Sequence, residues 1–206
     1  MTPLSPRIDI LPDSQRAVWK GLGFTREDFT LYGGTALAVR LGHRVSVDFD
    51  FFRFDEFDPA AFRKGQPALA AAEVLQMETN ALTVLVVAQG APVKLSFFGG
   101  LTFRQLEPPQ PTEDGILRVA SLPDLFATKL NVIYQRAEPK DYIDIDAILR
   151  NGYTLAEGID FALRVYGPDF NAMLPLQALC YFEEPALHDL PESMRRSLTQ
   201  AVRAVR

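Results

Sequence analysis

The sequence predicts an α/β protein in which a mixed sheet comes first and a helical region follows. Up to about residue 118, short apolar runs such as ALTVLVVA (81–88) and PVKLSFF (92–98) are bounded by turn residues, which is typical of strands. After that point the pattern changes to longer segments with helical periodicity. We therefore expect an α/β domain over residues 1–118 and a helical domain over residues 119–206.

The bulk properties describe an ordinary globular chain. With 206 residues, 48% apolar and 23% charged, the chain is long enough for an α/β domain with an appended smaller one. No apolar run approaches the ~20 residues of a membrane span, and the N-terminus lacks the apolar core of a secretory signal, so a cytoplasmic protein without membrane contact is expected. One cysteine excludes a disulfide framework, and a net charge of −5 argues against a surface devoted to coating nucleic acid.

The expected elements follow one another with short connections. The sequence predicts strands at residues 29–32, 44–52 and 116–120, a hairpin of strands 81–88 and 92–98, a loop at 108–115, and a helix that runs into a strand over 67–78. Helices are expected at residues 13–23, 35–41, 122–137, 140–150, 155–166, about 170–181, and 191–205.

Two carboxylates lie side by side on the expected strand RVSVDFDFF (44–52). Its alternation places Arg44, Ser46, Asp48 and Asp50 on one face and apolar residues on the other. Like charges this close repel and are costly to bury unless a cation compensates them. Mg²⁺ fits, because it is bound by one or two carboxylates together with substrate phosphates. Arg44 and Ser46 share this face, so they either contact a nucleotide or line the rim.

A glycine pair precedes this strand at the start of the helix expected at 35–41. Gly33 and Gly34 would let the backbone approach a phosphate closely, and the free N–H groups and dipole of a helix start favour an anion. Thr35 either adds a hydroxyl contact or caps the helix. Phosphates next to two carboxylates and Mg²⁺ point to metal-assisted phosphoryl or nucleotidyl transfer.

A second group of charges lies in the helical region. On a helical wheel, Lys129 and Arg136 fall inside the apolar arc of the first helix, while Asp141 lies in the apolar arc of the next helix, with Asp144 at its margin. Buried cations need an anionic partner. Two interpretations remain open: an interhelical salt bridge without substrate, or a site in which Lys129 meets nucleotide phosphates and Asp141 orients it.

These residues carry a resemblance to a known family. GGTALAVRLGHRVSVDFDFF (33–52) resembles the signature of the DNA polymerase β-like nucleotidyltransferases, and of their AbiEii/AbiGii toxin branch in particular. That branch continues with a helix bearing a lysine and then a Lys-Asp pair, and ATKLNVIYQRAEPKDYIDIDAIL (127–149) stands in the matching place. The resemblance covers roughly residues 31–150.

The resemblance implies a polymerase β-like core with a mixed sheet, followed by a helical domain that completes the active-site cleft. It implies an NTP- and Mg²⁺-dependent nucleotidyltransferase of abortive-infection or type IV toxin–antitoxin systems, with RNA such as tRNA as acceptor and a separate antitoxin protein. The implied catalytic residues are Asp48, Asp50, Lys129 and Asp141, the first two being metal ligands. The implied nucleotide-binding residues are Gly33, Gly34, Thr35, Arg44, Ser46, Arg136 and Asp144.

One feature of the family is missing. Polymerase β-like enzymes normally place a third carboxylate on a later strand, and the natural strand here, PVKLSFF, has Lys94 and Ser96 at its polar positions. A two-metal site is therefore not expected. Two alternatives stay open: a module that binds nucleotides or partners without transfer, and a nucleotidyltransferase that modifies a small molecule.

Overall fold

The computed structural model describes residues 2–205, which divide into two compact units. The sheet unit comprises the chain up to Thr102 together with Pro109–Ala120, and the helical unit comprises Phe103–Pro108 together with the chain from Ser121 onward. The boundary that the sequence predicts after residue 118 is two residues before the last passage between the units, which follows Ala120. The sequence does not predict that the short segment Phe103–Pro108 belongs with the helices.

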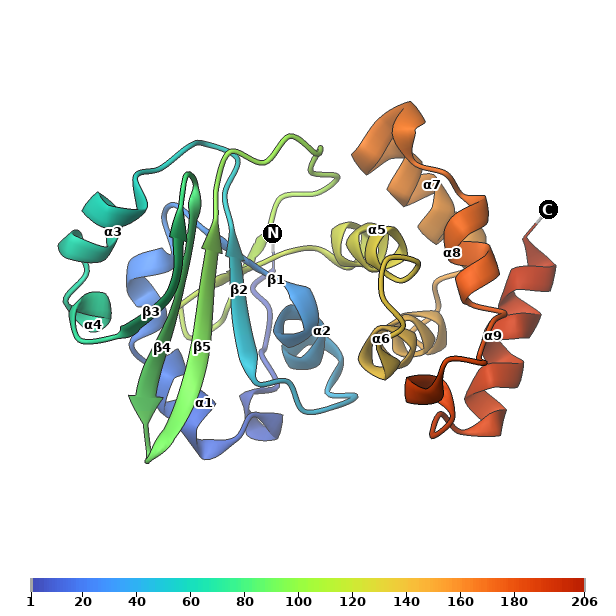
Figure 1. Ribbon diagram of the computed structural model, residues 1–206, viewed down its shortest axis with the longest axis horizontal. Coiled ribbons are helices and arrows are strands. Elements are labelled where there is room, and N and C mark those ends of the chain that lie inside the picture. The colour runs from blue at the N-terminus through green and yellow to red at the C-terminus, as the bar shows by residue number, and fades with distance from the viewer. Residues whose placement is uncertain (1, 206) are drawn as a thin grey trace. The chain divides into compact units, whose positions relative to one another are not determined.

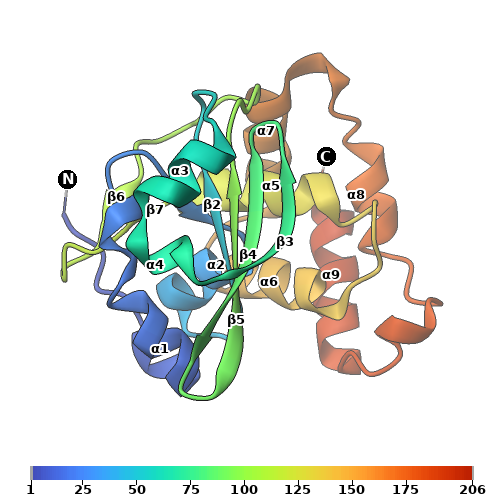
Figure 2. The ribbon, with the colours of Figure 1, turned by 60° about the vertical axis from the view of Figure 1, so that its left-hand side comes forward.

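A mixed sheet forms the centre of the sheet unit, as the sequence predicted. Within residues 2–205 it has seven strands in the order β3-β4-β5-β2-β1-β7-β6, and Figure 1 shows β3, β4, β5 and β2 side by side. Strands β2 and β5 run parallel, and so do β1 and β7. The bounds are β1 Thr30–Tyr32, β2 Asp48–Phe52, β3 Glu73–Glu78, β4 Ala81–Ala88, β5 Ala91–Phe98, β6 Gln110–Pro111 and β7 Arg118–Val119 (Figure 2).

The alternation of β2 separates a core face from a polar face. Phe49 and Phe51 are fully buried, and the rings of Trp19 and Phe97 pack against them. The residues between them are partly exposed. The helices of the sheet unit are α1 Asp13–Trp19, α2 Gly33–Leu41, α3 Pro59–Gly65 and α4 Pro67–Ala70, with 3₁₀ turns at Ile8–Ile10 and Leu22–Thr25.

Strand β2 is shorter than the sequence predicted. The expected strand 44–52 begins at Asp48, and Val45 and Val47 are 56% and 50% exposed rather than part of the core. The physical reason is that side chains take the backbone groups a neighbouring strand would need. The Gln15 amide donates to the Val47 carbonyl at 2.9 Å, and the Arg44 guanidinium donates to the Val45 carbonyl at 3.0 Å.

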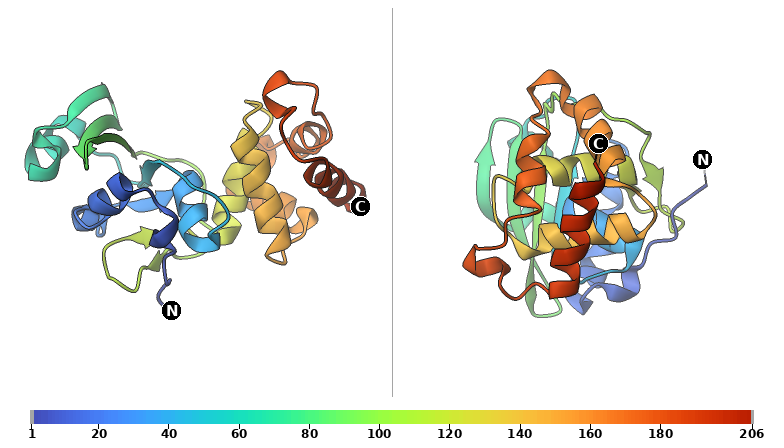
Figure 3. Two further views of the ribbon diagram at one scale, coloured as in Figure 1. Left: turned by 90° about the horizontal axis from the view of Figure 1, so that it is seen from below. Right: turned by 90° about the vertical axis from the view of Figure 1, so that its right-hand side faces the viewer.

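The helical unit is built from helices that pack on one another. Helix α5 packs against both α6 and α7, and α9 packs against α6 and α7 (Figure 3). Gly158 permits the close approach of α7 to α5, because an added Cβ would lie 2.5 Å from the Phe126 ring. The bounds are α5 Leu122–Val132, α6 Pro139–Arg150, α7 Leu155–Tyr166, α8 Met173–Ala178 and α9 Glu192–Ala204, with 3₁₀ turns at Gly167–Asp169 and Pro185–Leu187.

Asp124 explains why Phe103–Pro108 joins the helical unit. Its buried carboxylate accepts hydrogen bonds from the amides of Leu106 at 2.8 Å and Glu107 at 3.2 Å, and from the Ser121 hydroxyl at 2.6 Å. Ser121 also caps α5, since its hydroxyl accepts a bond from the Asp124 amide. No helix within residues 2–205 has both the length and the apolar character that a membrane crossing requires.

The hydrogen bonds to the Asp114 carboxylate in the sheet unit give a first prediction, which concerns the pH dependence of stability. Burial alone would raise the pKa of Asp114, but hydrogen bonds from Thr112, Trp19 and the Ile116 amide outweigh it, so the pKa lies below its ordinary value of 3.8. Because the folded-state pKa is depressed, this contribution to stability is present above pH 3.8 and disappears as the pH falls through the lower, folded-state value. We expect Asp114→Asn to lower the urea midpoint at neutral pH and to differ less from the unmodified protein in acid.

Asp160→Asn is the matched control, because Asp160 is an exposed residue on α7 whose ion pair with Arg164 spans 3.5 Å. Its midpoint is expected to stay within error of the unmodified protein at both pH values. An Asp114→Asn deficit that is equally large in acid would contradict the assignment.

Candidate active site

The two carboxylates on β2 are the centre of the candidate site. Asp48 and Asp50 lie two residues apart on the polar face of the strand, and both are partly exposed while the phenylalanines beside them are buried. The side chain of Asp48 is 36% exposed. Strand β2 therefore presents two solvent-accessible carboxylates on the same face.

The neighbouring strand β5 places a cation beside this pair. In the parallel register, Lys94 lies opposite Asp48 and Ser96 opposite Asp50. The Lys94 ammonium is 3.0 Å from Asp48 Oδ2, and its side chain is 38% exposed. The sequence predicts that this strand lacks an acid, but it does not predict the ion pair. The alternation of β5 is the sequence feature that could have indicated this pair, since Lys94 and Ser96 share one strand face as Asp48 and Asp50 do.

The start of α2 lies against the same strand, and its two glycines leave room for neighbouring side chains that a Cβ would contact. Gly33 has a φ of +71°, and an added Cβ would lie 2.7 Å from Asp50 Oδ2. A Cβ at Gly34 would lie 2.5 Å from Arg44 Nη2 and 3.1 Å from Ser46 Oγ. The structure thus brings five of the predicted site residues together at one helix N-terminus, namely Gly33, Gly34, Arg44, Ser46 and Asp50.

Thr35 holds this arrangement rather than capping the helix. Its residue is 1% exposed, and its hydroxyl bonds both the Asp48 carbonyl and, at 2.9 Å, the Ser46 hydroxyl. Since a carbonyl only accepts, the Thr35 hydroxyl donates to the Asp48 carbonyl and accepts a hydrogen bond from the Ser46 hydroxyl. Of the two alternatives for Thr35, the helix cap is wrong, because Tyr32 occupies the N-cap position and no side chain bonds there.

The close approach of Asp50 to Gly33 leads to a second prediction. Gly33→Ala should displace the Asp50 carboxylate and strain the backbone, because a positive φ is unfavourable for alanine. We expect a loss of about 1–3 kcal/mol in the free energy of unfolding and weaker Mg²⁺-dependent NTP binding. Gly23→Ala is the control, since nothing lies within 4 Å of its added Cβ. Unchanged NTP affinity in Gly33→Ala would show that the start of α2 does not contribute to NTP binding.

In the helical unit, the structure assembles the second predicted group of charges. The Lys129 ammonium lies 2.7 Å from Asp141 Oδ1 and 2.7 Å from Asp144 Oδ2, and both carboxylates are fully buried. The Lys129 side chain is 6% exposed. Arg136 Nε lies 2.9 Å from Asp141 Oδ2, and its side chain is 45% exposed. The helix-pairing ion pair foreseen as one of two interpretations is thus present, with Asp144 as a full member rather than a marginal one.

Arg136 is not on the helix that the sequence predicted. Helix α5 ends at Val132 instead of residue 137, so Arg136 lies in the connection to α6. Its place on the apolar arc was therefore wrong. From the connection its guanidinium binds Asp141 and remains half-exposed, which makes it the accessible cation of the group.

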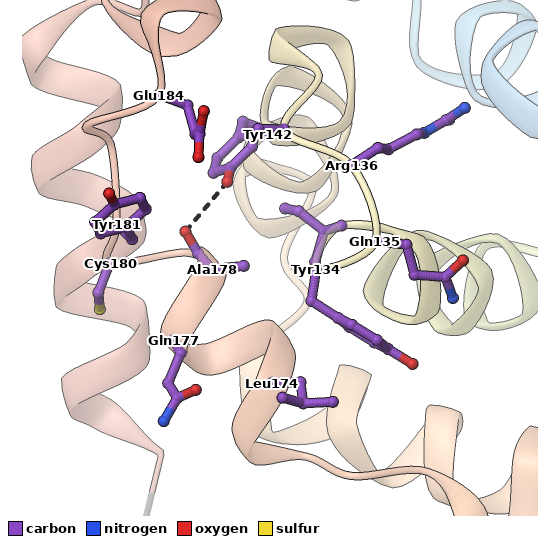
Figure 4. Close-up of a pocket in the computed structure, with 12 residues that line it drawn as sticks. Tyr134, Gln135, Arg136, Tyr142, Leu174, Gln177, Ala178, Cys180, Tyr181 and Glu184 are labelled. Carbon is purple, nitrogen blue, oxygen red and sulfur yellow. Dashed lines mark hydrogen bonds between the residues drawn. The ribbon is translucent and has the colours of Figure 1, made fainter.

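An open pocket of about 770 Å³ extends from Arg136 within the helical unit (Figure 4). Its three tyrosines come from the α5–α6 connection, from α6 and from the stretch after α8. Burial raises the pKa of Tyr142 to about 12, and the charges of Asp141 and Glu184 act in the same direction. Tyr142 therefore stays protonated and donates to the Ala178 carbonyl at 3.2 Å. The lining residues are Ile133, Tyr134, Gln135, Arg136, Ala137, Tyr142, Leu174, Gln177, Ala178, Cys180, Tyr181 and Glu184.

The acidic pair fits a hard divalent cation. Asp48 and Asp50 offer carboxylate oxygens, the ligand type that Mg²⁺ takes together with substrate phosphates and water. Among residues 2–205 no group of three or more histidine, cysteine and acidic side chains is arranged to hold a metal. A metal at this pair would therefore depend on ligands from the nucleotide.

Comparison with solved structures identifies the fold. A protein from H. pylori assigned as a nucleotidyltransferase superposes with a TM-score of 0.59 at 17% identity, covering 92% of this chain and 90% of its own. MenT4, a nucleotidyltransferase toxin from Mycobacterium tuberculosis H37Rv, gives a TM-score of 0.58 at 14% identity, covering 88% and 77%. The fold is that of the nucleotidyltransferases, as the resemblance implied.

The sequence comparisons then define the family. Residues 18–204 match the model of the family described as nucleotidyl transferase AbiEii toxin, type IV TA system. An uncharacterised protein of Aquifex aeolicus (strain VF5) is 34% identical over 161 residues, which are 76% of this chain and 75% of the relative. The chain belongs to the AbiEii nucleotidyltransferase toxin family, and it is a nucleotidyltransferase.

Proposed function

We propose that this protein transfers a nucleotide from an NTP to an acceptor, with one Mg²⁺ held by Asp48 and Asp50. One observation carries the proposal: two accessible carboxylates share a strand face at the glycine start of a helix. This arrangement combines metal ligands with an anion-binding backbone, which is what a metal–triphosphate substrate requires. Family membership supports the same reaction class.

The reaction assigns a task to each group around the pair. The acceptor oxygen forms a bond to the α-phosphorus and its proton leaves to solvent. The bond from the α-phosphorus to the bridging oxygen of the β-phosphate breaks, and pyrophosphate leaves with that electron pair. Mg²⁺, when bound, would neutralise charge on the transferred group. Asp48 and Asp50 hold the ion, and the backbone of Gly33 and Gly34 receives phosphate oxygens. Arg44 contacts phosphate, while Ser46 and Thr35 position Asp48 through the hydroxyl chain.

In the helical unit, Arg136 is the proposed phosphate contact, because it is the exposed member of its ion-pair group. Lys129, Asp141 and Asp144 then position it. Lys129 keeps the buried Asp141 charge compensated, and Asp141 holds the guanidinium. This assignment gives Lys129 a role through Asp141 in place of direct phosphate contact.

The pocket beside Arg136 is proposed to receive a nucleobase. Its size lies in the range of ligand pockets, its walls include three aromatic rings, and Gln135 and Gln177 offer amide donors and acceptors. Apart from Arg136 and Glu184, whose charges oppose, the lining is uncharged. An uncharged planar group with polar edges matches that lining.

RNA, with tRNA as the leading candidate, is the proposed acceptor, and a separate antitoxin protein is the proposed regulator. The antitoxin proposal rests on the family, which is described as a type IV TA system. The RNA acceptor rests on the resemblance set out in the sequence analysis. Because the proposed acceptor is RNA and the proposed regulator is an antitoxin protein, we also propose a cytoplasmic location.

The deciding experiment incubates the purified protein and Asp48→Asn with each labelled NTP, Mg²⁺ and either total RNA or purified tRNA. We expect label in RNA from the unmodified protein with one preferred NTP, and none from Asp48→Asn. Label in a small molecule instead of RNA would show that the acceptor is a small molecule.

A second candidate function is nucleotide binding without transfer. The observation that favours it is that Lys94 and Ser96 occupy the strand positions opposite the two aspartates, where a third acid would be expected. Tight NTP binding combined with no label in any RNA pool would support this candidate over transfer.

A further inference from the structure

We propose that Lys94 is a catalytic residue that provides the positive charge a second metal ion would otherwise bring. In this role its ammonium contacts the attacking acceptor oxygen and stabilises the negative charge that develops as the acceptor's proton leaves to solvent. The inference rests on the proposed function, because it concerns the same nucleotidyl transfer: acceptor oxygen to α-phosphorus bond formed, pyrophosphate released with its electron pair.

The position of Lys94 is the first observation behind this role. The parallel pairing of β5 with β2 fixes Lys94 opposite Asp48, and the ammonium lies 3.0 Å from Asp48 Oδ2. The lysine side chain remains 38% exposed, so its remaining N–H groups can reach a substrate oxygen. The ion pair with Asp48 limits where the ammonium can lie.

The charge of the site is the second observation. Two carboxylates with one ammonium and one Mg²⁺ leave a single net positive charge. Three carboxylates with two Mg²⁺, the arrangement of a two-metal site, leave the same net charge. Lys94 thus takes the place of both a carboxylate ligand and the ion that it would hold, and the net charge of the site is the same in both arrangements.

The surroundings of Lys94 offer no ligand set for a second ion. Ser96, the other polar residue of β5 facing this strand, is 4% exposed and carries a neutral hydroxyl. In the part of the chain that the structure describes, no cluster of three potential metal ligands occurs. A second divalent cation would also be repelled by the ammonium already paired with Asp48.

The test compares Lys94→Met, Lys94→Arg and the exposed control Lys64→Met in two measurements. The first is Mn²⁺ binding with a non-hydrolysable NTP analogue, followed by electron paramagnetic resonance. The second is the rate of transfer. We expect one Mn²⁺ per chain in the unmodified protein. In Lys94→Met, Mn²⁺ should bind several-fold more tightly because the competing charge is gone, while kcat falls by about 10²-fold.

Lys94→Arg should restore most of the rate, and Lys64→Met should change neither measurement. Lys94→Glu should bind a second Mn²⁺, and this stoichiometry supports the proposal even where no transfer is detected. Metal affinity that rises in Lys94→Met without loss of rate would overturn it, because Lys94 would then only compete with the ion. Two ions in the unmodified protein would also overturn it. Unchanged Mn²⁺ binding in Asp48→Asn would instead reject the metal site, and with it the proposed function.

Discussion

Asp48→Asn and Asp50→Asn are each expected to abolish Mg²⁺-dependent NTP binding and to lower transfer by at least about 10²–10³-fold. An amide is a poor ligand for a hard cation, and each substitution removes one of the two carboxylates on the polar face of β2. The fold should survive, since relief of like-charge repulsion offsets the loss of local bonds. For Asp48, the exposed pair with Lys94 is worth only about 0–1 kcal/mol.

Titration calorimetry with Mg²⁺ and each NTP measures this result directly, and circular dichroism checks the fold. The matched control is Asp55→Asn, which removes an acid of the same unit whose side chain is 93% exposed. It should bind Mg²⁺–NTP as the unmodified protein does. Unchanged affinity in both Asp48→Asn and Asp50→Asn would be incompatible with the metal site.

Lys129→Met is expected to lower the free energy of unfolding by about 3–5 kcal/mol. The substitution keeps the apolar stem but removes the ammonium from two fully buried carboxylates, each 2.7 Å away. Arg136 still binds Asp141, but the cation shared with Asp144 is gone. The main source of the cost is the loss of an ammonium that compensates two buried negative charges.

Two further variants test this explanation by urea unfolding. Lys140→Met removes a half-exposed lysine that pairs with Glu138 at 2.7 Å, and a change of at most about 1 kcal/mol is expected. Combining Lys129→Met with Asp144→Asn should recover part of the loss, because the two residues interact directly. A small loss of stability in Lys129→Met, together with weaker NTP binding per folded molecule, would instead assign Lys129 to the substrate.

Local patterns were enough to predict most elements of this fold. The alternating runs at 81–88 and 92–98 became β4 and β5, and residues 67–78 became α4 followed by β3, as expected. Gly42 ends α2 with a φ of +65°, the conformation that a glycine stop predicts. These features depend on residues close together in sequence, so a single chain contains the information.

The features that were missed depend on contacts between distant segments. Val47 is exposed because Gln15, far away in the sequence, takes its carbonyl. The ion pair of Lys94 with Asp48 follows from the register of two strands that are not consecutive.

The chain passes between the two units three times, after Thr102, Pro108 and Ala120, so neither unit is a continuous stretch of polypeptide. During synthesis, the amides of Leu106 and Glu107 leave the ribosome before the Asp124 carboxylate that accepts their hydrogen bonds. Strand β1 likewise is synthesised long before β7, its parallel neighbour in the sheet. A fragment that began at Ser121 would bury that carboxylate without its two amide donors. No single proteolytic cut therefore releases one unit intact, and truncation is a poor route to either half.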